Sequence, residues 1–182
     1  MSNHMDLEYE MFCYQCEQTA NGKGCTKLGV CGKTPEIANL QDLLIFQLKG
    51  IGYLGKRMMD RGEQVEKEVI RFVEFVLFTT LTNVNFDAEV HVDLLKKSQK
   101  VKEELLRKLK QNKGQVQAKK EKWQDSGMES DVEAKLSTDL GTDENMMKIF
   151  PVYVTYVLPE TKSEMLQSAG IAGLMYDKSL DP

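Results

Sequence analysis

The residues best suited to chemistry in this sequence are its four cysteines, which all lie between positions 13 and 31. They follow the pattern Cys13-x2-Cys16-x8-Cys25-x5-Cys31, and the remaining chain contains no cysteine. Four thiolates can hold an iron–sulfur cluster or a structural zinc ion. Zinc sites usually use two closely spaced pairs, and here only the first pair is close. The spacing therefore favours an iron–sulfur cluster, with zinc and disulfides as alternatives.

The residues around the cysteines suit an anionic cofactor. Glycines between and beside the cysteines allow tight turns and a close approach of backbone N–H groups to sulfur. Lysines flank the same cysteines, and a helix that begins at Pro35 directs the positive end of its dipole towards Cys31. We expect these charges to raise the reduction potential of a bound cluster. The glycines are Gly22, Gly24, Gly29 and Gly32, and the lysines are Lys23, Lys27 and Lys33.

The chain after the cysteines predicts an all-α fold, an antiparallel helical bundle preceded by the glycine-rich cysteine loop. Thr34, Pro35 and Glu36 form a helix start, and Gly62 is a suitable end. A second helix is expected over 63–82, buried between neighbours because Phe75, Leu77 and Phe78 add apolar surface on further faces. A third is expected from the cap at Asp87 to about residue 112. The first helix carries an apolar stripe of Ile37, Leu40, Leu44, Leu48, Ile51, Leu54 and Met58.

The C-terminal part gives weaker signals. Residues 115–124 could form a helix, and residues 125–145 are polar and acidic. The segment 151–157 alternates like a strand and is predicted to be extended, and residues 160–174 predict a last helix. The sequence therefore divides into an N-terminal segment with the cysteine loop (1–34), a three-helix core (35–113) and a polar region (114–182). The polar region is expected to continue or cap the bundle.

Composition and charge limit the classes of partner. The 182 residues carry a net charge of −4, and no apolar run approaches the length of a membrane span. The N-terminus lacks the layout of a signal peptide, so we expect a cytoplasmic protein with no membrane partner. The basic stretch 96–122 fits the solvated outer face of the third helix, with Lys96, Lys97 and Lys100 outward. It lacks interleaved aromatic residues, so docking of a protein is the alternative and nucleic acid is not expected.

The motif resembles a known family. MFCYQCEQTANGKGCTKLGVCGKTPEIANLQDLL, the LKG at 48–50 and the TNVNFD at 82–87 are similar to the N-terminal region of the hybrid cluster (prismane) proteins. These are also named hydroxylamine reductases and are relatives of the carbon monoxide dehydrogenases. The resemblance is near-continuous over 11–60, fair to about 110 and thin afterwards. It implies that Cys13, Cys16, Cys25 and Cys31 hold a [4Fe–4S] cluster, with [2Fe–2S] and zinc as alternatives.

In that family, the corresponding cluster relays electrons to a second, mixed cluster that is thought to reduce hydroxylamine or nitric oxide. This chain has no fifth cysteine, and we place His91 on a helix surface and His4 in an N-terminal stretch without a structural role. A second cluster is therefore not expected. The chain looks like the first helical domain of such an oxidoreductase, without catalytic residues of its own.

Its expected partners are a redox donor protein or the remaining domains of a hybrid cluster protein, with a homodimer as a further option. Two other functions stay open: a stand-alone redox sensor and a structural zinc-binding interaction module.

Overall fold

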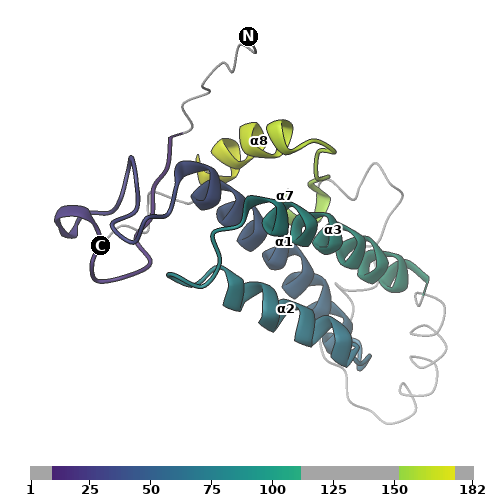
Figure 1. Ribbon diagram of the computed structural model, residues 1–182. Helices are drawn as coiled ribbons and strands as arrows, with labels where there is room; N and C mark the ends of the chain where they lie inside the picture. The colour runs from purple at the N-terminus through teal and green to yellow at the C-terminus, as the bar shows by residue number, and fades with distance from the viewer. Residues whose placement is uncertain (1–9, 112–151, 175–182) are drawn as a thin grey trace, which may run out of the picture. The chain divides into compact units, whose positions relative to one another are not determined.

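The computed structural model describes residues 10–111 and 152–174 (Figure 1). All regular elements in these residues are helices. The β-type pairing found among them is one isolated antiparallel bridge between Cys13 and Cys25. The all-α prediction is therefore confirmed for the described residues. The elements are η1 (Ala20–Gly22), α1 (Pro35–Asp60), α2 (Lys67–Thr79), α3 (Ala88–Gln111), α7 (Val152–Thr155) and α8 (Lys162–Leu174).

Helix α1 forms as its sequence predicts. The Thr34 hydroxyl caps it by accepting a hydrogen bond from the Ile37 N–H at 3.3 Å, and Pro35 occupies the first helical position. The chain leaves the helix at Gly62, whose φ of 73° is the left-handed conformation typical of a helix C-terminus. The predicted apolar stripe is buried at every position: Ile37, Leu40, Leu44, Leu48, Ile51, Leu54 and Met58.

Helix α2 differs from the prediction that it is buried between neighbours. Phe75, Leu77 and Phe78 are 55%, 45% and 57% exposed. Within the helix, Phe72 and Val76 provide the buried apolar side chains. Only the face of α2 that carries these buried residues packs against the rest of the described chain. Phe75, Leu77 and Phe78 lie on its other faces and therefore remain exposed.

Helix α3 begins at the expected cap, where the Asp87 carboxylate accepts hydrogen bonds from the N–H groups of Glu89 and Val90. Lys96, Lys97 and Lys100 are exposed, as predicted. Val90 is 38% exposed, whereas the neighbouring His91 is fully buried. The buried face of the helix is a stripe at three- and four-residue steps, formed by His91, Leu95, Ser98, Lys102, Leu105 and Leu109.

The prediction of an extended segment at 151–157 is wrong, because Val152–Thr155 form the short helix α7. A helical turn satisfies backbone hydrogen bonds locally, whereas an isolated strand needs a partner. The last predicted helix is confirmed as α8. Thr161 and Glu164 form a capping box there, in which each side chain accepts a hydrogen bond from the other residue's backbone N–H at 3.3 Å. The predictions for 115–124 and 125–145 lie outside the described residues.

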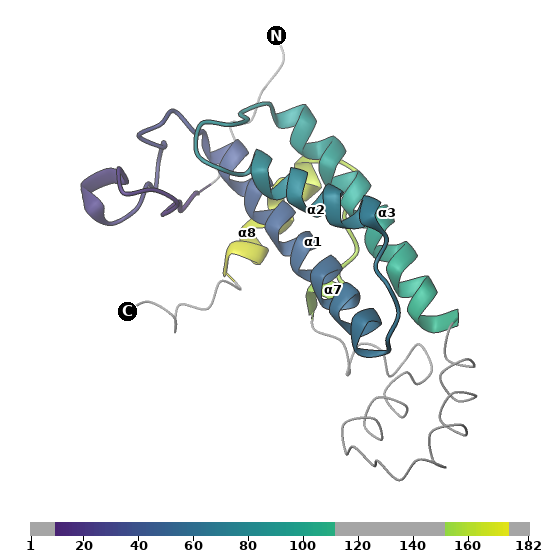
Figure 2. The same cartoon turned by 90° about the horizontal axis from the view of Figure 1, so that it is seen from below.

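The described residues form two compact units. The first comprises residues 10–46, 71–97 and 158–174. In this unit α8 lies beside the beginning of α1 in both views (Figures 1 and 2), and Lys162 bridges Glu36 of α1 and Glu89 of α3 at 3.1 and 2.8 Å. The cysteine loop also belongs to this unit.

The second unit comprises residues 47–70, 98–111 and 152–157. Gln47 contacts Gln99, and Arg61 donates a hydrogen bond to the carbonyl of Leu109 at 2.9 Å, so the α1 and α3 segments run parallel. Glu66, just before α2, contacts Lys108 near the end of α3, so α2 starts where α3 ends. The antiparallel order of the whole bundle stays a prediction from the short connections. No helix in residues 10–111 and 152–174 combines the length and apolar character needed to cross a membrane.

Candidate metal centre

The cysteine loop is held together by its own backbone. Cys13 and Cys25 exchange two N–H···O=C hydrogen bonds, of 3.0 and 2.9 Å, and form an antiparallel bridge. Met11 and Cys25 pack on Ala38 of α1 in a small apolar cluster. The Asn39 side-chain amide of α1 also donates to the carbonyl of Glu10 at 2.9 Å. Protein contacts alone therefore hold two of the four predicted ligands, Cys13 and Cys25, next to each other and against α1.

Cys25 lies in surroundings that stabilise a thiolate. Its side chain is 4% exposed, and its sulfur accepts a hydrogen bond from the Ala20 N–H at 3.4 Å. The pKa of the Cys25 thiol is lowered, first by the Ala20 N–H and then by the Val30 N–H, against a weaker opposing effect of burial. The positive charge of Lys33 lowers this pKa further. Since the thiolate is the form that binds metals, these contacts suit Cys25 to its predicted role as a ligand.

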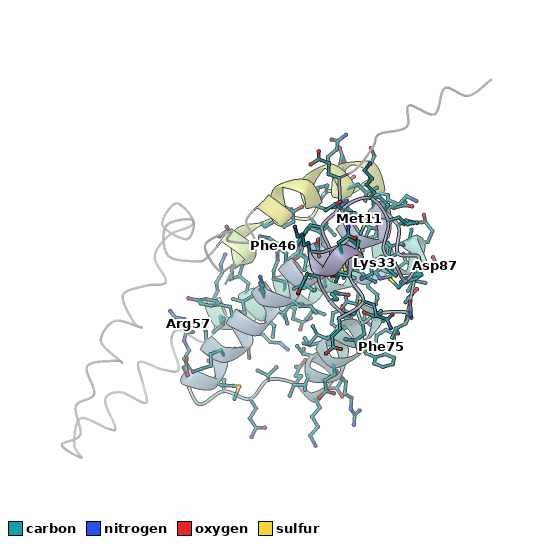
Figure 3. All side chains as sticks on the ribbon, turned by 90° about the vertical axis from the view of Figure 1, so that its left-hand side faces the viewer. Met11, Lys33, Phe46, Arg57, Phe75 and Asp87 are labelled. Carbon is teal, nitrogen blue, oxygen red and sulfur yellow. The ribbon has the colours of Figure 1, made fainter. Side chains whose placement is uncertain are left out.

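Lys33 differs from the other two lysines of the loop. Its side chain is only 1% exposed, whereas Lys23 and Lys27 are exposed to solvent. Its ammonium group donates a hydrogen bond to Gln15 Oε1 at 2.7 Å and lies 3.9 Å from the sulfur of Cys13. Figure 3, which looks onto the loop, labels Lys33 among the loop's side chains. The sequence predicted that three lysines flank the cysteines, and the structure buries one of them, Lys33.

Two glycines leave room that any larger residue would fill. A Cβ atom at Gly29 would lie 3.1 Å from the sulfur of Cys31 and 2.9 Å from Cβ of Lys33. A Cβ atom at Gly24, where φ is 109°, would lie 2.5 Å from the ring of Phe12. The N–H groups of these two glycines donate to oxygen atoms, Gly29 to the Lys33 carbonyl and Gly24 to the Thr19 hydroxyl, and not to sulfur as predicted. Both glycines are needed instead for close packing of neighbouring side chains.

All four cysteines lie among the described residues, and none of them is joined in a disulfide. Cys16 and Cys31 are partly exposed. Within residues 10–111 and 152–174, no group of three or more Cys, His, Asp or Glu side chains is arranged to hold a metal ion. The donor set fits a tetrathiolate cofactor in chemistry, since it provides four thiols, one of them with a lowered pKa, beside a buried cation. The convergence of all four sulfurs on one centre stays a prediction.

The prediction that His91 lies on a helix surface is wrong. The side chain is fully buried, with Nδ1 2.6 Å from the carbonyl oxygen of Asp87 and Nε2 3.2 Å from Nε2 of Gln41. Both ring nitrogens are therefore engaged by protein groups. Sequence reasoning also missed Gln15, the hydrogen-bond acceptor of Lys33, because an exposed polar residue in a loop carries no spacing signal. His4 lies outside the described residues.

Comparisons with known proteins agree with the motifs. The model of the Prismane/CO dehydrogenase family matches residues 11–171. A hydroxylamine reductase of Thermotoga maritima is 37% identical over 180 residues, covering 94% of this chain and 39% of that protein. One from Caldanaerobacter subterraneus is 39% identical over 155 residues, covering 81% and 28%. One from Thermoanaerobacter pseudethanolicus is 49% identical over 100 residues, covering 55% and 18%.

These matches confirm the resemblance predicted from the cysteine motif and extend it, because the family match continues well beyond residue 110. The chain spans less than two-fifths of the length of each of these three relatives.

Proposed function

This chain belongs to the Prismane/CO dehydrogenase family, and on that premise we propose that it is an iron–sulfur electron-transfer domain. Cys13, Cys16, Cys25 and Cys31 are the proposed ligands of one [4Fe–4S] cluster. One observation carries the proposal: a single loop presents four unbridged thiols and supplies an N–H donor to the buried sulfur of Cys25. The family membership favours iron over zinc for this thiol set.

A bound cluster would supply one-electron chemistry. Four cysteine ligands would leave no iron open to a substrate, so the chain would transfer electrons without binding a substrate at the metal. The chain's own residues would hold the cluster and stabilise charge on its sulfur ligands. The Ala20 and Val30 N–H groups donate to the sulfur of Cys25, and donors of this kind stabilise negative charge on the sulfurs.

The relatives are named hydroxylamine reductases. We propose that this chain corresponds to the electron-relaying part of such an oxidoreductase and lacks the second, mixed cluster, because its sequence contains only four cysteines. Its proposed partners are a redox donor protein or the remaining domains of a hybrid cluster protein, and a second copy of the chain is an alternative. The chain alone is expected not to reduce hydroxylamine. Reductant-dependent ammonia formation above a metal-free control would contradict that expectation.

The decisive experiment is iron, sulfide and zinc analysis of protein purified without oxygen, together with its visible absorption and electron paramagnetic resonance spectra. About four irons and four sulfides per chain, with absorption that bleaches on reduction, would support the proposal. About two irons would keep electron transfer and change the cluster to [2Fe–2S]. One zinc ion in a colourless protein would replace the proposal with a structural zinc module.

Single substitutions to serine test the ligands. Each of Cys13, Cys16, Cys25 and Cys31 should lower the iron content when replaced, because serine oxygen is a poor substitute for thiolate sulfur. The exposed Thr26→Ala, next to Cys25, is the matched control and should leave the iron content unchanged. If iron is retained after replacement of any one cysteine, that residue is not a ligand. Reversible binding of a partner on loss of the cluster would favour a redox sensor over an electron carrier.

A further inference from the structure

We propose that Lys33 sets the reduction potential of the proposed cluster by holding a fixed positive charge beside Cys13. The inference rests on the proposed function, since it concerns a cluster bound by the four cysteines. The sequence pattern predicted that Lys23, Lys27 and Lys33 together raise the reduction potential, and we assign this effect mainly to Lys33.

The burial of Lys33 is the first step. A buried ammonium group is destabilising unless nearby polar or negatively charged groups compensate for the lost water. The structure gives the Lys33 ammonium group an uncharged partner, Gln15 Oε1 at 2.7 Å, and a sulfur that can carry negative charge, Cys13 Sγ at 3.9 Å. The chain therefore buries a positive charge at the place where a thiolate is expected.

The backbone keeps Lys33 in this position. Its carbonyl accepts a hydrogen bond from the Gly29 N–H at 2.7 Å, and Gly29 lacks the Cβ that would come within 2.9 Å of Cβ of Lys33. Lys33 directly precedes Thr34, which caps α1, so the start of the helix also restrains the Lys33 backbone. The backbone of Lys33 is therefore held by the loop and by α1, whereas Lys23 and Lys27 are exposed to solvent.

The chemistry follows from charge. Transfer of one electron from a reductant to the proposed cluster would add one negative charge to the site beside Lys33. A fixed cation nearby stabilises the reduced site more than the oxidised site, which raises the reduction potential. Exposed lysines at a similar place in the sequence act more weakly, because water screens them.

The test is a potentiometric titration with dithionite, followed by electron paramagnetic resonance, on four variants and the wild-type chain. Lys33→Met removes the charge and keeps the length of the side chain, and Lys33→Arg keeps the charge. Lys23→Met and Lys27→Met are the matched controls, since each removes one positive charge from the same loop. We expect Lys33→Met to lower the equilibrium constant for reduction at least tenfold, which is ~59 mV for one electron. Lys33→Arg and the two controls should remain within a third of that shift.

The outcomes separate the two proposals. A wild-type chain without iron would overturn both. A wild-type chain with a cluster, and a Lys33→Met potential no lower than those of the controls, would overturn the inference alone. Equal shifts of the reduction potential in Lys33→Met and Lys33→Arg would also overturn the inference, because the effect would then come from the shape of the side chain and not from its charge. If Lys33→Met folds by circular dichroism but retains no iron, retention of iron in Lys33→Arg supports the role of charge, and loss in both refutes it.

Discussion

Replacing Lys102 with methionine should change how the stability of this chain depends on pH. Lys102 is on the buried face of α3 and is 2% exposed, and its ammonium group donates a hydrogen bond to the carbonyl of Tyr156 at 2.5 Å. Burial lowers its pKa from 10.5 to about 8, with the nearby Glu103 acting in the opposite direction. The folded chain therefore carries a lysine that loses its proton more readily than it would after unfolding.

The sign of the effect follows from proton binding. Between pH 8 and 10.5 the unfolded chain binds the Lys102 proton more tightly than the folded chain, so this residue makes stability rise with pH across that window. Below pH 8 the folded state carries the full unfavourable effect of the buried charge. The difference between the two pKa values corresponds to about 3 kcal/mol at 1.36 kcal/mol per pH unit. Screening by nearby water reduces this, and we expect about 2 kcal/mol.

The assay is urea unfolding of wild-type and Lys102→Met chains from pH 7 to 10.5, under reducing conditions without oxygen. The free energy of unfolding of the wild type relative to the variant should increase by about 2 kcal/mol between pH 8 and 10.5. Lys100→Met, at an exposed position on the same helix, is the control and should show no such pH dependence. A constant difference between wild type and Lys102→Met over the whole range would refute the reasoning.

Three further predictions concern packing, capping and the loop. Leu44→Ala should lower the free energy of unfolding by roughly 2–5 kcal/mol, because Leu44 is fully buried. Leu77→Ala, at a 45% exposed position, should change it by less than about 1 kcal/mol. Equal effects of the two substitutions in urea unfolding would contradict the burial of Leu44. Asp87→Ala should cost about 1 kcal/mol, since its carboxylate caps α3 through the Glu89 N–H at 2.9 Å, and Asp87→Asn should restore most of it. Gly24→Ala should reduce iron incorporation, because the new Cβ would meet an aromatic ring at 2.5 Å in a backbone conformation with φ of 109°; iron content equal to that of the wild type would count against the loop geometry.

Local signals were enough to predict α1, α8 and the beginning of α3. Each rests on neighbouring residues alone, such as the hydroxyl of Thr34 before Pro35 or the carboxylate of Asp87 before α3. The position of the four cysteines in one glycine-rich loop was equally readable, because spacing within 19 residues is a local property.

Features that depend on tertiary partners were not readable. His91 and Lys102 are polar, so a hydrophobic pattern places them outside, yet both lie on the buried face of α3. Their burial depends on Gln41 for His91 and on the Tyr156 carbonyl for Lys102, and neither partner is close in sequence. Similarly, nothing in the spacing separates Lys33 from the other lysines of the loop, because its burial depends on how the loop folds back on Gln15.

The backbone pairing of Cys13 with Cys25 would lower the entropic cost of binding a metal, because part of the loop is already closed in the folded chain. Closing a flexible segment of 11 intervening residues costs roughly 2 kcal/mol through the length-dependent part of loop entropy. Two backbone hydrogen bonds already close this segment in the folded chain. Small tetrathiolate domains often use metal-binding energy to fold. If the proposed cluster binds, the segment between Cys13 and Cys25 would need no further closing, and more of the binding energy would remain as affinity for the metal.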